Sequence, residues 1–369
     1  MNSMAIALLA NAGVASSLIF IPNFAREAGA SEGQIGLIFA AHSAMALLAS
    51  FVFGRLADVR GRRRILQAGL LLSVAAAGLQ VLADEPLTIG LSRAFLGLAL
   101  GMYPGALIAY AYEARERMGR FAAYGSIGWA IGNLAAGALA FLYPSQFVLV
   151  FAGSSALFFA AWLAALRLAV TPEESLVVPR IPLAVIRRNL AVYATMLIRH
   201  TGANMIWVIF SLYLYDRGFA YWEIGLVTAV NPIVQAIISR QLDGYRASVL
   251  IPIGVSLSAL VFVVFTITAG VIQMILAQVL LGFSWATLYV GCLKFVTERN
   301  EERATAAGLL GSTTTLAAIL GPLAGGVISA AFGYSAAMYA AAGMCGLALL
   351  TYVMATRTDR HAVGAPGRG

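Results

Sequence analysis

Long apolar segments, each about twenty residues long, recur along almost the whole of this 369-residue chain. A helix of about twenty apolar residues crosses the hydrocarbon core of a bilayer. Charged residues make up 11% of the chain. Soluble domains are about a quarter charged, so lipid must be the solvent for most of this chain. We predict an all-α polytopic membrane protein with twelve transmembrane helices near 4–25, 33–54, 63–83, 86–112, 120–143, 146–167, 189–214, 222–241, 247–268, 270–296, 304–330 and 335–356.

The longest polar interruption separates these spans into two groups of six. It covers 169–188 and contains Pro172, Pro179 and Pro182 together with several charges. No connection is long enough to bury a core of its own. We therefore expect an N-terminal six-helix bundle at 1–168, a cytoplasmic linker at 169–188, a C-terminal six-helix bundle at 189–356 and a cytoplasmic tail at 357–369.

Basic residues predict the orientation. With the N-terminus in the cytoplasm, the cytoplasmic loops and the tail hold twenty of the 24 Lys and Arg residues, and the opposite loops hold only Arg26 and Arg217. This bias is the positive-inside pattern of membrane proteins rather than the basic face of a nucleic-acid-binding protein. We predict a multi-pass protein of the cytoplasmic (inner) membrane, surrounded by the lipid bilayer, with both termini cytoplasmic and no nucleic-acid partner.

The two halves are related in sequence. The segment IGLIFAAH at 35–42 recurs as IGLVTAVN at 224–231, which aligns His42 with Asn231. A second pair of segments, 93–117 and 278–302, aligns Gly97 with Gly282. Two similar six-span halves predict a pseudo-two-fold axis along the membrane normal. Transporters with this architecture bind their substrate between the halves near mid-membrane.

The loop between spans 2 and 3 carries the most specific motif, GRLADVRGRRRIL, at 54–66. This motif resembles the signature loop of the major facilitator superfamily, G-x-L-a-D-r-x-G-r-[rk]-x-x-l. The matching residues are Gly54, Leu56, Ala57, Asp58, Gly61, Arg62, Arg63 and Leu66, and Val59 departs from the pattern. The corresponding stretch of the second half, 239–247, keeps Asp243 and Arg246. The resemblance covers the whole chain through the six-plus-six layout, and it implies a secondary transporter that works by alternating access.

In that family the loop acts as a cytoplasmic latch. The resemblance places Asp58 near the N-terminal end of span 11, where the helix dipole favours negative charge, and the arginines near Glu113 and Glu116. The alternative is a loop that only sets topology, but topology requires neither the aspartate nor two glycines at fixed spacing. The predicted gating residues are Gly54, Asp58, Gly61, Arg62, Arg63, Glu113, Asp243 and Arg246.

Polar residues within the spans predict a substrate site, because polar groups at membrane depth are costly and usually face an interior. In span 7, His200, Asn204, Trp207 and Ser211 recur at helical spacing beside Arg199, and in span 10 Gln278, Trp285 and Tyr289 do the same. The family resemblance implies that spans 1, 4, 7 and 10 line the cavity. For Arg93 in span 4, a structural role at backbone carbonyls is the alternative. The predicted substrate-binding residues are Arg199, His200, Asn204, Trp207, Asn231, Gln235, Trp285, Tyr289, Arg93 and Tyr103.

The sequence leaves open whether transport is coupled to protons. None of the sixteen acidic residues lies at mid-membrane, whereas histidine titrates near neutral pH. The candidates are therefore His42, His200 and Glu113, with a hydrogen bond to a neighbouring helix as the alternative for His42; uniport and exchange stay possible. Arginines without acids at depth predict an electropositive cavity and an anionic or neutral polar substrate.

Other functional classes lack support in the sequence. There is no P-loop, so ATP is not the direct energy source, and the three histidines lie on unrelated elements, so we predict neither metal nor cofactor. A polytopic enzyme or receptor would need a cluster of catalytic residues or an output domain. A drug or multidrug efflux antiporter is the main alternative, but span 5 lacks the proline of that group's signature. Its segment YGSIGWAIG at 124–132 is more similar to the fifth span of oligosaccharide and aromatic-acid proton symporters. We expect a monomer with a small-molecule substrate.

Overall fold

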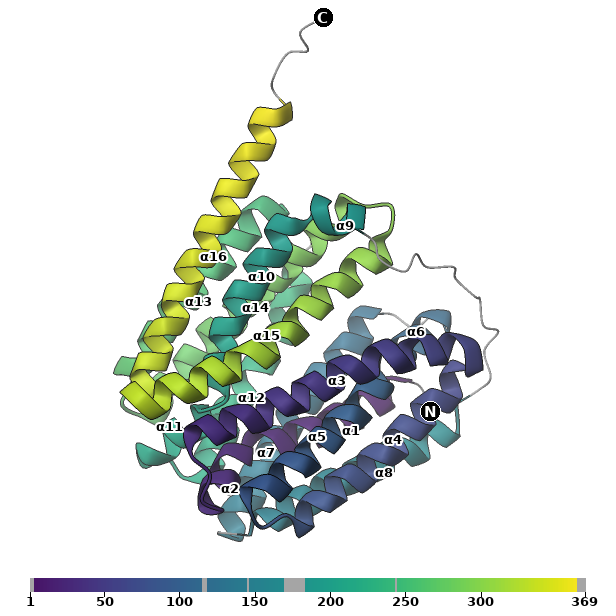
Figure 1. The fold of residues 1–369 in the computed structure, drawn as a ribbon, viewed down its shortest axis with the longest axis vertical. Coiled ribbons are helices and arrows are strands. Elements are labelled where there is room, and N and C mark those ends of the chain that lie inside the picture. Colours follow the sequence, from purple (N-terminus) through teal and green to yellow (C-terminus); the bar gives the residue numbers. More distant parts are fainter. Residues whose placement is uncertain (1–2, 115–117, 145, 169–182, 243, 364–369) are drawn as a thin grey trace, which may run out of the picture.

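The computed structural model describes residues 3–114, 118–144, 146–168, 183–242 and 244–363, and every regular element in these ranges is a helix (Figure 1). The first half contains α1 (Ser3–Ile19), α2 (Ile21–Glu27), α3 (Glu32–Arg60), α4 (Arg62–Leu79), α5 (Pro86–Met102), α6 (Pro104–Glu113), α7 (Met118–Leu142) and α8 (Phe147–Leu166). The second half contains α9 (Leu183–Arg188), α10 (Leu190–Trp207), α11 (Phe210–Asp216), α12 (Tyr221–Ile238), α13 (Ala247–Ile267), α14 (Val271–Glu298), α15 (Arg303–Phe332) and α16 (Tyr334–Val363).

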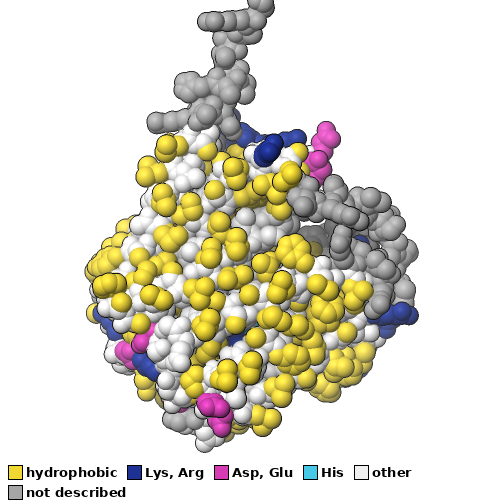
Figure 2. Space-filling view, viewed as in Figure 1, with side chains coloured by type: hydrophobic (Ala, Val, Ile, Leu, Met, Phe, Trp, Pro, Cys, Tyr) yellow, Lys and Arg dark blue, Asp and Glu magenta, His cyan; other side chains and the backbone are white. Residues whose placement is uncertain are grey.

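The helices have the length and composition of membrane spans. Eleven helical segments within the described ranges are long and apolar enough to cross a bilayer. Hydrophobic side chains cover most of the face drawn in Figure 2, and most charged side chains on this face lie toward its two ends. This distribution confirms a polytopic all-α membrane protein, because only the ends of the spans meet water.

The predicted seventh span is a broken helix. It consists of α10 and α11, which are separated at Val208 and Ile209. This segment is not among the eleven apolar spans, because α10 carries Arg199, His200 and Asn204 within 18 residues. The polar residues that predicted a substrate site are therefore also the reason why span 7 is less apolar than the other eleven spans.

Two predicted boundaries differ from the structure. The helix α9 occupies 183–188, which we assigned to the linker, and 169–182 lie outside the described residues. The helix α16 continues to Val363, beyond the predicted start of the tail at 357. Both differences arise because charged residues near a span end do not stop a helix, although they do mark the limit of the apolar segment.

A glycine of the signature loop has a backbone role. Gly61 separates α3 from α4 with a φ of 98°, in the region that residues with a Cβ rarely adopt. Its amide donates to the carbonyl of Ala57 and so ends α3. The fixed glycine in the motif is thus explained by the turn between spans 2 and 3.

The internal repeat is reproduced in the packing of equivalent helices. A methyl group on Gly97 of α5 would overlap the carbonyl of His42 on α3. In the second half, a methyl group on Gly282 of α14 would lie 2.9 Å from the carbonyl oxygen of Asn231 on α12. The two aligned glycines therefore bring equivalent helix pairs into close contact, as small residues do in membranes.

The two halves meet at one end of the molecule, which we call the closed end. There α3 crosses α15 and α7 crosses α12. A methyl group on Gly326 would lie 2.5 Å from the carbonyl oxygen of Glu32, and one on Gly225 would lie 2.9 Å from the Cα of Gly137. Backbone atoms of the two halves are thus in direct contact at this end.

The same helices separate at the other end, which we call the open end. Among the described residues, no atom of another helix lies within 4 Å of a methyl group built on Gly54 of α3 or on Gly308 or Gly311 of α15. Gly36, which touches α15, and Gly54 are eighteen residues apart on one helix, or about 27 Å. Figure 1 shows α3 and α15 meeting near α11 and diverging toward α6 and α9.

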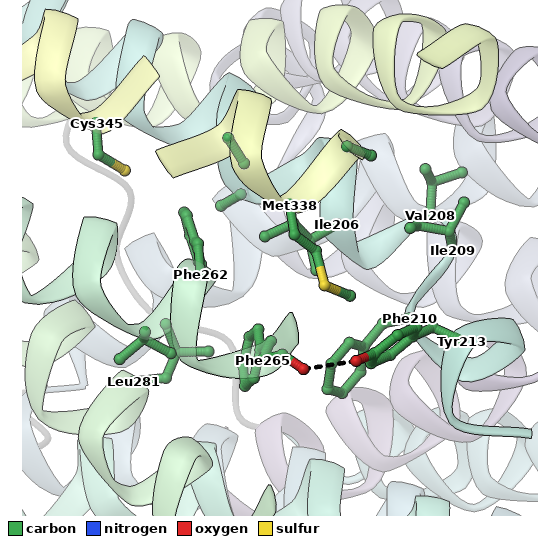
Figure 3. Packing of buried hydrophobic residues seen from close by; sticks show 14 of the residues in the cluster. Ile206, Val208, Ile209, Phe210, Tyr213, Phe262, Phe265, Leu281, Met338 and Cys345 are labelled. Carbon is green, nitrogen blue, oxygen red and sulfur yellow. Dashed lines mark hydrogen bonds between the residues drawn. The ribbon is translucent and has the colours of Figure 1, made fainter. Parts of the chain in front are cut away.

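The break in span 7 is fixed by an apolar core. Figure 3 shows Phe210 beside Phe265, and Val208 and Ile209 belong to the same apolar cluster. The hydroxyl of Tyr213 on α11 donates to the carbonyl oxygen of Phe265 over 2.6 Å. This bond satisfies a carbonyl close to the C-terminal end of α13 and attaches α11 to it, because an unpaired polar group in hydrocarbon is costly.

Candidate functional site

A cavity of about 760 Å³ lies between the two halves. Its first wall is formed by α1, α3 and α7, and its second by α10, α11, α12, α14 and α15. Closely packed glycines bring the wall helices of the first half together, since methyl groups on Gly128 and Gly132 of α7 would overlap carbonyls of α1. Sites of this size, with a mostly apolar wall and a few polar groups, are typical of small-molecule binding.

Arg199 is the cationic group of the cavity. Its side chain is 2% exposed, and its Nε donates to the hydroxyl of Ser258 over 2.9 Å. The guanidinium lies 5.1 Å from the ring centre of Trp285 and 5.6 Å from that of Phe262. Among the described residues, no carboxylate forms an ion pair with it. A buried cation held only by neutral groups and aromatic rings leaves an electropositive site for an incoming ligand.

The span 7 stripe is brought together as a surface of the cavity. His200, Asn204 and Trp207 all line it. The imidazole of His200 stacks on Trp285 at 4.8 Å, and the amide of Asn204 donates to the carbonyl oxygen of His200 over 2.8 Å. The Nδ1 of His200 lies 3.5 Å from a guanidinium nitrogen of Arg199, which can only donate. Four of the predicted residues of span 7 therefore lie in the cavity wall together with Trp285 of α14. They are Arg199, His200, Asn204 and Trp207.

Asn231 and Gln235 of α12 also line the cavity, where the amide of Gln235 donates to the carbonyl oxygen of the Asn231 side chain. His42 of α3 lies in the opposite wall, and its Nδ1 is 2.8 Å from the backbone carbonyl oxygen of Arg93. A carbonyl can only accept, so Nδ1 carries the proton and Nε2 is the free acceptor nitrogen.

Three of the predicted substrate-binding residues do not line the cavity. Arg93 is 1% exposed and donates to Ser17 and Gln80 of its own half, each over 3.3 Å. Tyr103 is buried against α4. Tyr289 stacks on Trp285, its neighbour on α14, at 5.4 Å but does not itself line the cavity. No residue of α5 contributes to the wall. The expectation that span 4 lines the cavity is therefore wrong for this structure, because α5 is covered by α3 at the Gly97 contact.

Sequence reasoning missed part of the first wall. Asn11 of α1 and Trp129 and Asn133 of α7 line the cavity. The indole of Trp129 donates to the side-chain oxygen of Asn11 over 3.0 Å, and Asn133 donates across the halves to the carbonyl oxygen of Thr228 over 3.2 Å. The available signal was the spacing of four between Trp129 and Asn133 on the glycine-rich span, together with an isolated asparagine in the first span.

The closed end carries charged and hydroxyl groups from both halves. Arg26 of α2 donates to Asp216 of α11 over 2.8 Å, and the two side chains are 31% and 41% exposed. Tyr334 donates to the same carboxylate over 3.2 Å. These contacts join the halves beyond the glycine crossings.

The predicted latch is only partly described. Arg63 donates to the carbonyl oxygen of Leu166 over 2.9 Å, at the C-terminal end of α8 in its own half. Arg62 lies in the first turn of α4, and Arg246 directly precedes α13. The side chains of Asp58 and Glu113, and the whole of Asp243, lie outside the described residues. The latch therefore remains a prediction.

The wall holds no arrangement suited to a metal, since within the described part of the chain no group of three His, Cys, Asp or Glu could hold an ion. The chemistry that the cavity offers is hydrogen bonding by amides and hydroxyls, stacking on indoles and pairing with one guanidinium. These interactions are suited to binding a small polar solute.

Comparisons with known proteins agree with the fold. No curated protein sequence matches the chain. The solved structure of the nucleoside transporter NupG superposes with a TM-score of 0.80 at 14% identity, covering 95% of this chain and 97% of that one. A bacterial homologue of the human lysosomal transporter Spinster, in an inward-facing and unoccupied conformation, gives a TM-score of 0.78 at 15% identity, with 96% of each chain covered. The sequence model of the Major Facilitator Superfamily matches residues 3–238 and 192–368, and the chain therefore belongs to the major facilitator superfamily of transporters.

Proposed function

We propose that the protein carries a small polar or anionic organic solute across the cytoplasmic membrane by alternating access. The observation that supports this most directly is the position of Arg199, a 2% exposed guanidinium in the wall of a cavity between the two halves. A planar guanidinium can bind a carboxylate or phosphate through two parallel hydrogen bonds. An organic cation is disfavoured at the same position, which argues against the drug-efflux alternative.

The two ends of the molecule support alternating access. The halves touch through backbone at the closed end and separate at the open end, which supports access to the cavity from the open end only. With both termini in the cytoplasm, as the distribution of basic residues predicts, the open end faces the cytoplasm. Rocking of one half against the other would then expose the same site to the opposite side.

Cysteine labelling tests this orientation. Glu85 directly precedes α5 at the closed end, and Arg64 lies in the first turn of α4 at the open end. In a variant in which Cys292 and Cys345 are replaced, we expect a membrane-impermeant reagent added outside cells to label a cysteine at 85 and not at 64. Labelling at 64 alone would reverse the topology.

Proton coupling through His42 is the second part of the proposal. Its Nδ1 is committed to the carbonyl of Arg93, so Nε2 is the basic nitrogen of a side chain in the cavity wall. The His42→Gln variant should keep solute exchange between the two sides, which needs no net proton movement, and lose accumulation driven by a pH gradient. Accumulation at the wild-type level in this variant would exclude His42 as the coupling residue.

Reconstitution tests the function as a whole. Purified protein in liposomes is offered a panel of carboxylates, sugar phosphates, glycosides, nucleosides and organic cations; nucleosides are included because NupG is a nucleoside transporter of the same fold. We expect uptake of an anionic or neutral polar member. Uptake of organic cations alone would favour the drug antiporter, and no movement of any solute would favour the polytopic enzyme or receptor.

A further inference from the structure

Two polar side chains in the cavity wall lack hydrogen-bond partners. Gln278 of α14 is 0% exposed, and neither its amide nitrogen nor its oxygen has a partner within the described part of the chain. The hydroxyl of Ser211 on α11, a residue 3% exposed, is also unpaired. Burying a polar group without a partner is unfavourable, so three such atoms in one cavity wall require an explanation.

Other amide side chains of the same wall are paired. Asn133 donates to Thr228, Asn204 donates to the carbonyl of His200, and Asn231 accepts from Gln235. The unpaired state of Gln278 is therefore not a general property of this wall. Among the described amides that line the cavity, Gln278 alone leaves its donor and acceptor available for a ligand, although Asn23, which does not line the cavity, is also unpaired.

The unpaired atoms lie on the closed-end side of Arg199. Gln278 precedes Trp285 by seven residues on α14, which corresponds to about 10 Å along the helix. Trp285 is the residue on which the Arg199 guanidinium rests. Ser211 follows the break in span 7, whereas Arg199 precedes it. The cavity thus presents a cation at one level and a neutral donor–acceptor group about two helical turns away.

The closed-end part of the cavity wall contains several large apolar side chains. Leu281 lies one turn away on α14, and Phe210 and Val208 line the cavity from the broken span. Figure 3 shows Leu281, Phe265 and Phe210 in one apolar layer. A sugar ring carries hydroxyls on every side, and in this layer most of them would stay unpaired. A planar ring that is polar along one edge fits better.

A carboxamide offers a donor and an acceptor side by side. Its complement is an N–H next to a C=O, as in a ring lactam. A carboxylate accepts only, so it would leave the oxygen of Gln278 unpaired. We infer that the transported solute contains a planar lactam ring, as in a pyrimidine base, whose N–H and C=O pair with Gln278 and whose other end carries an acceptor group for Arg199. This inference rests on the proposed function and names the substrate class of that same cavity.

The pairing is tested from the ligand and from the protein together. Uridine and N3-methyluridine are compared by calorimetry on the purified full chain, since the methyl group removes the lactam donor and leaves the rest of the molecule unchanged. We expect wild type to bind uridine at least tenfold more tightly than its N3-methyl analogue, a difference of about 1.4 kcal/mol. The Gln278→Met variant should bind both with the same weak affinity, and Ser211→Ala should weaken uridine several-fold. Gln67→Met is the matched control, because Gln67 pairs with Ala165 outside the cavity wall.

The outcomes separate the subsite from the transporter itself. Equal binding of the two ligands by wild type, or wild-type preference in Gln278→Met, overturns the inference. If Gln278→Met does not fold, the two ligands are compared on Gln278→Glu instead, where the preference for uridine should also be lost. The wild-type comparison applies in either case. Uptake of methyl glucoside or benzoate into liposomes without binding of uridine refutes the lactam subsite and leaves the proposed transport function standing. Liposomes that move no solute of any class refute both.

Discussion

The Gly225→Ala substitution should favour the conformation in which the two halves are separated at the closed end. Gly225 lies where α12 crosses α7, and a Cβ there would be 2.7 Å from the carbonyl oxygen of Asn133 and 2.9 Å from the Cα of Gly137. Both contacts involve backbone, which cannot move aside as a flexible side chain can. The Gly225→Ala variant therefore forces the two helices apart only in the conformation in which the closed end is shut.

The size of the effect follows from the packing. Inserting a methyl group into a well-packed contact costs about 1–3 kcal/mol, and the cost disappears once α7 and α12 separate. The conformational equilibrium should then shift about 5- to 150-fold toward the state in which α7 and α12 are separated at the closed end. The Arg26–Asp216 ion pair is partly exposed on both sides, and such pairs contribute about 0.2–1 kcal/mol. The Asp216→Asn variant should accordingly cause a smaller shift than Gly225→Ala.

Distances between the halves provide the assay. Leu82 and Ile272 are 75% and 76% exposed, so spin labels at these positions of a variant without Cys292 and Cys345 should not disturb packing. Electron–electron resonance should show a longer-distance population that grows in Gly225→Ala.

The control is Gly90→Ala, where the new methyl group would lie 3.6 Å from Ile38 of the same half. It should leave the distribution unchanged. If Gly225→Ala matches wild type, or Gly90→Ala shifts the distribution equally, the glycine crossing does not set the conformational equilibrium.

Three further predictions concern single charges. Arg199→Lys keeps the charge but loses the planar guanidinium, so it should weaken ligand binding measured by calorimetry. Its elution volume in size-exclusion chromatography should not change. The control Arg167→Lys, at an exposed helix end, should leave binding unchanged. Asp58→Asn should insert normally and strongly reduce uptake into liposomes; wild-type turnover would reduce the signature loop to a topology signal. Arg93→Met removes the donor to two buried groups and should lower the melting temperature by an amount equivalent to about 2–3 kcal/mol, while the ligand affinity of the folded protein stays within twofold.

The helices and their pairing were predictable from sequence because their causes are local. Apolar length defines a span, and the equivalence of Gly97 and Gly282 followed from two aligned segments. The break at Val208 and Ile209 was not predictable, because neither residue is a helix breaker and the apolar core around them determines where the chain turns. The small shifts at α9 and α16 have the same origin, since composition marks the bilayer boundary and not the end of hydrogen bonding.

The site was harder to predict because helical spacing gives a face but not what the face meets. The stripe from His200 to Trp207 does line the cavity. Arg93 has the same residue type and a similar depth, yet its side chain turns toward Ser17 and Gln80. Nothing in the spacing distinguishes the two arginines, because the difference depends on which helix covers each one.

The two halves carry different polar side chains at equivalent positions of the repeat. In the alignment of the halves, Arg93 corresponds to Gln278 and His42 to Asn231. Arg93 is satisfied inside its own half and supports the carbonyl that orients His42. Gln278, at the equivalent position, is left without a partner in the cavity wall. The aligned glycines Gly97 and Gly282 bring equivalent helix pairs close together, while the side chains at the aligned positions differ. Under the proposed function, the second half would supply most of the groups that hold the solute, and the first half the histidine that carries a proton.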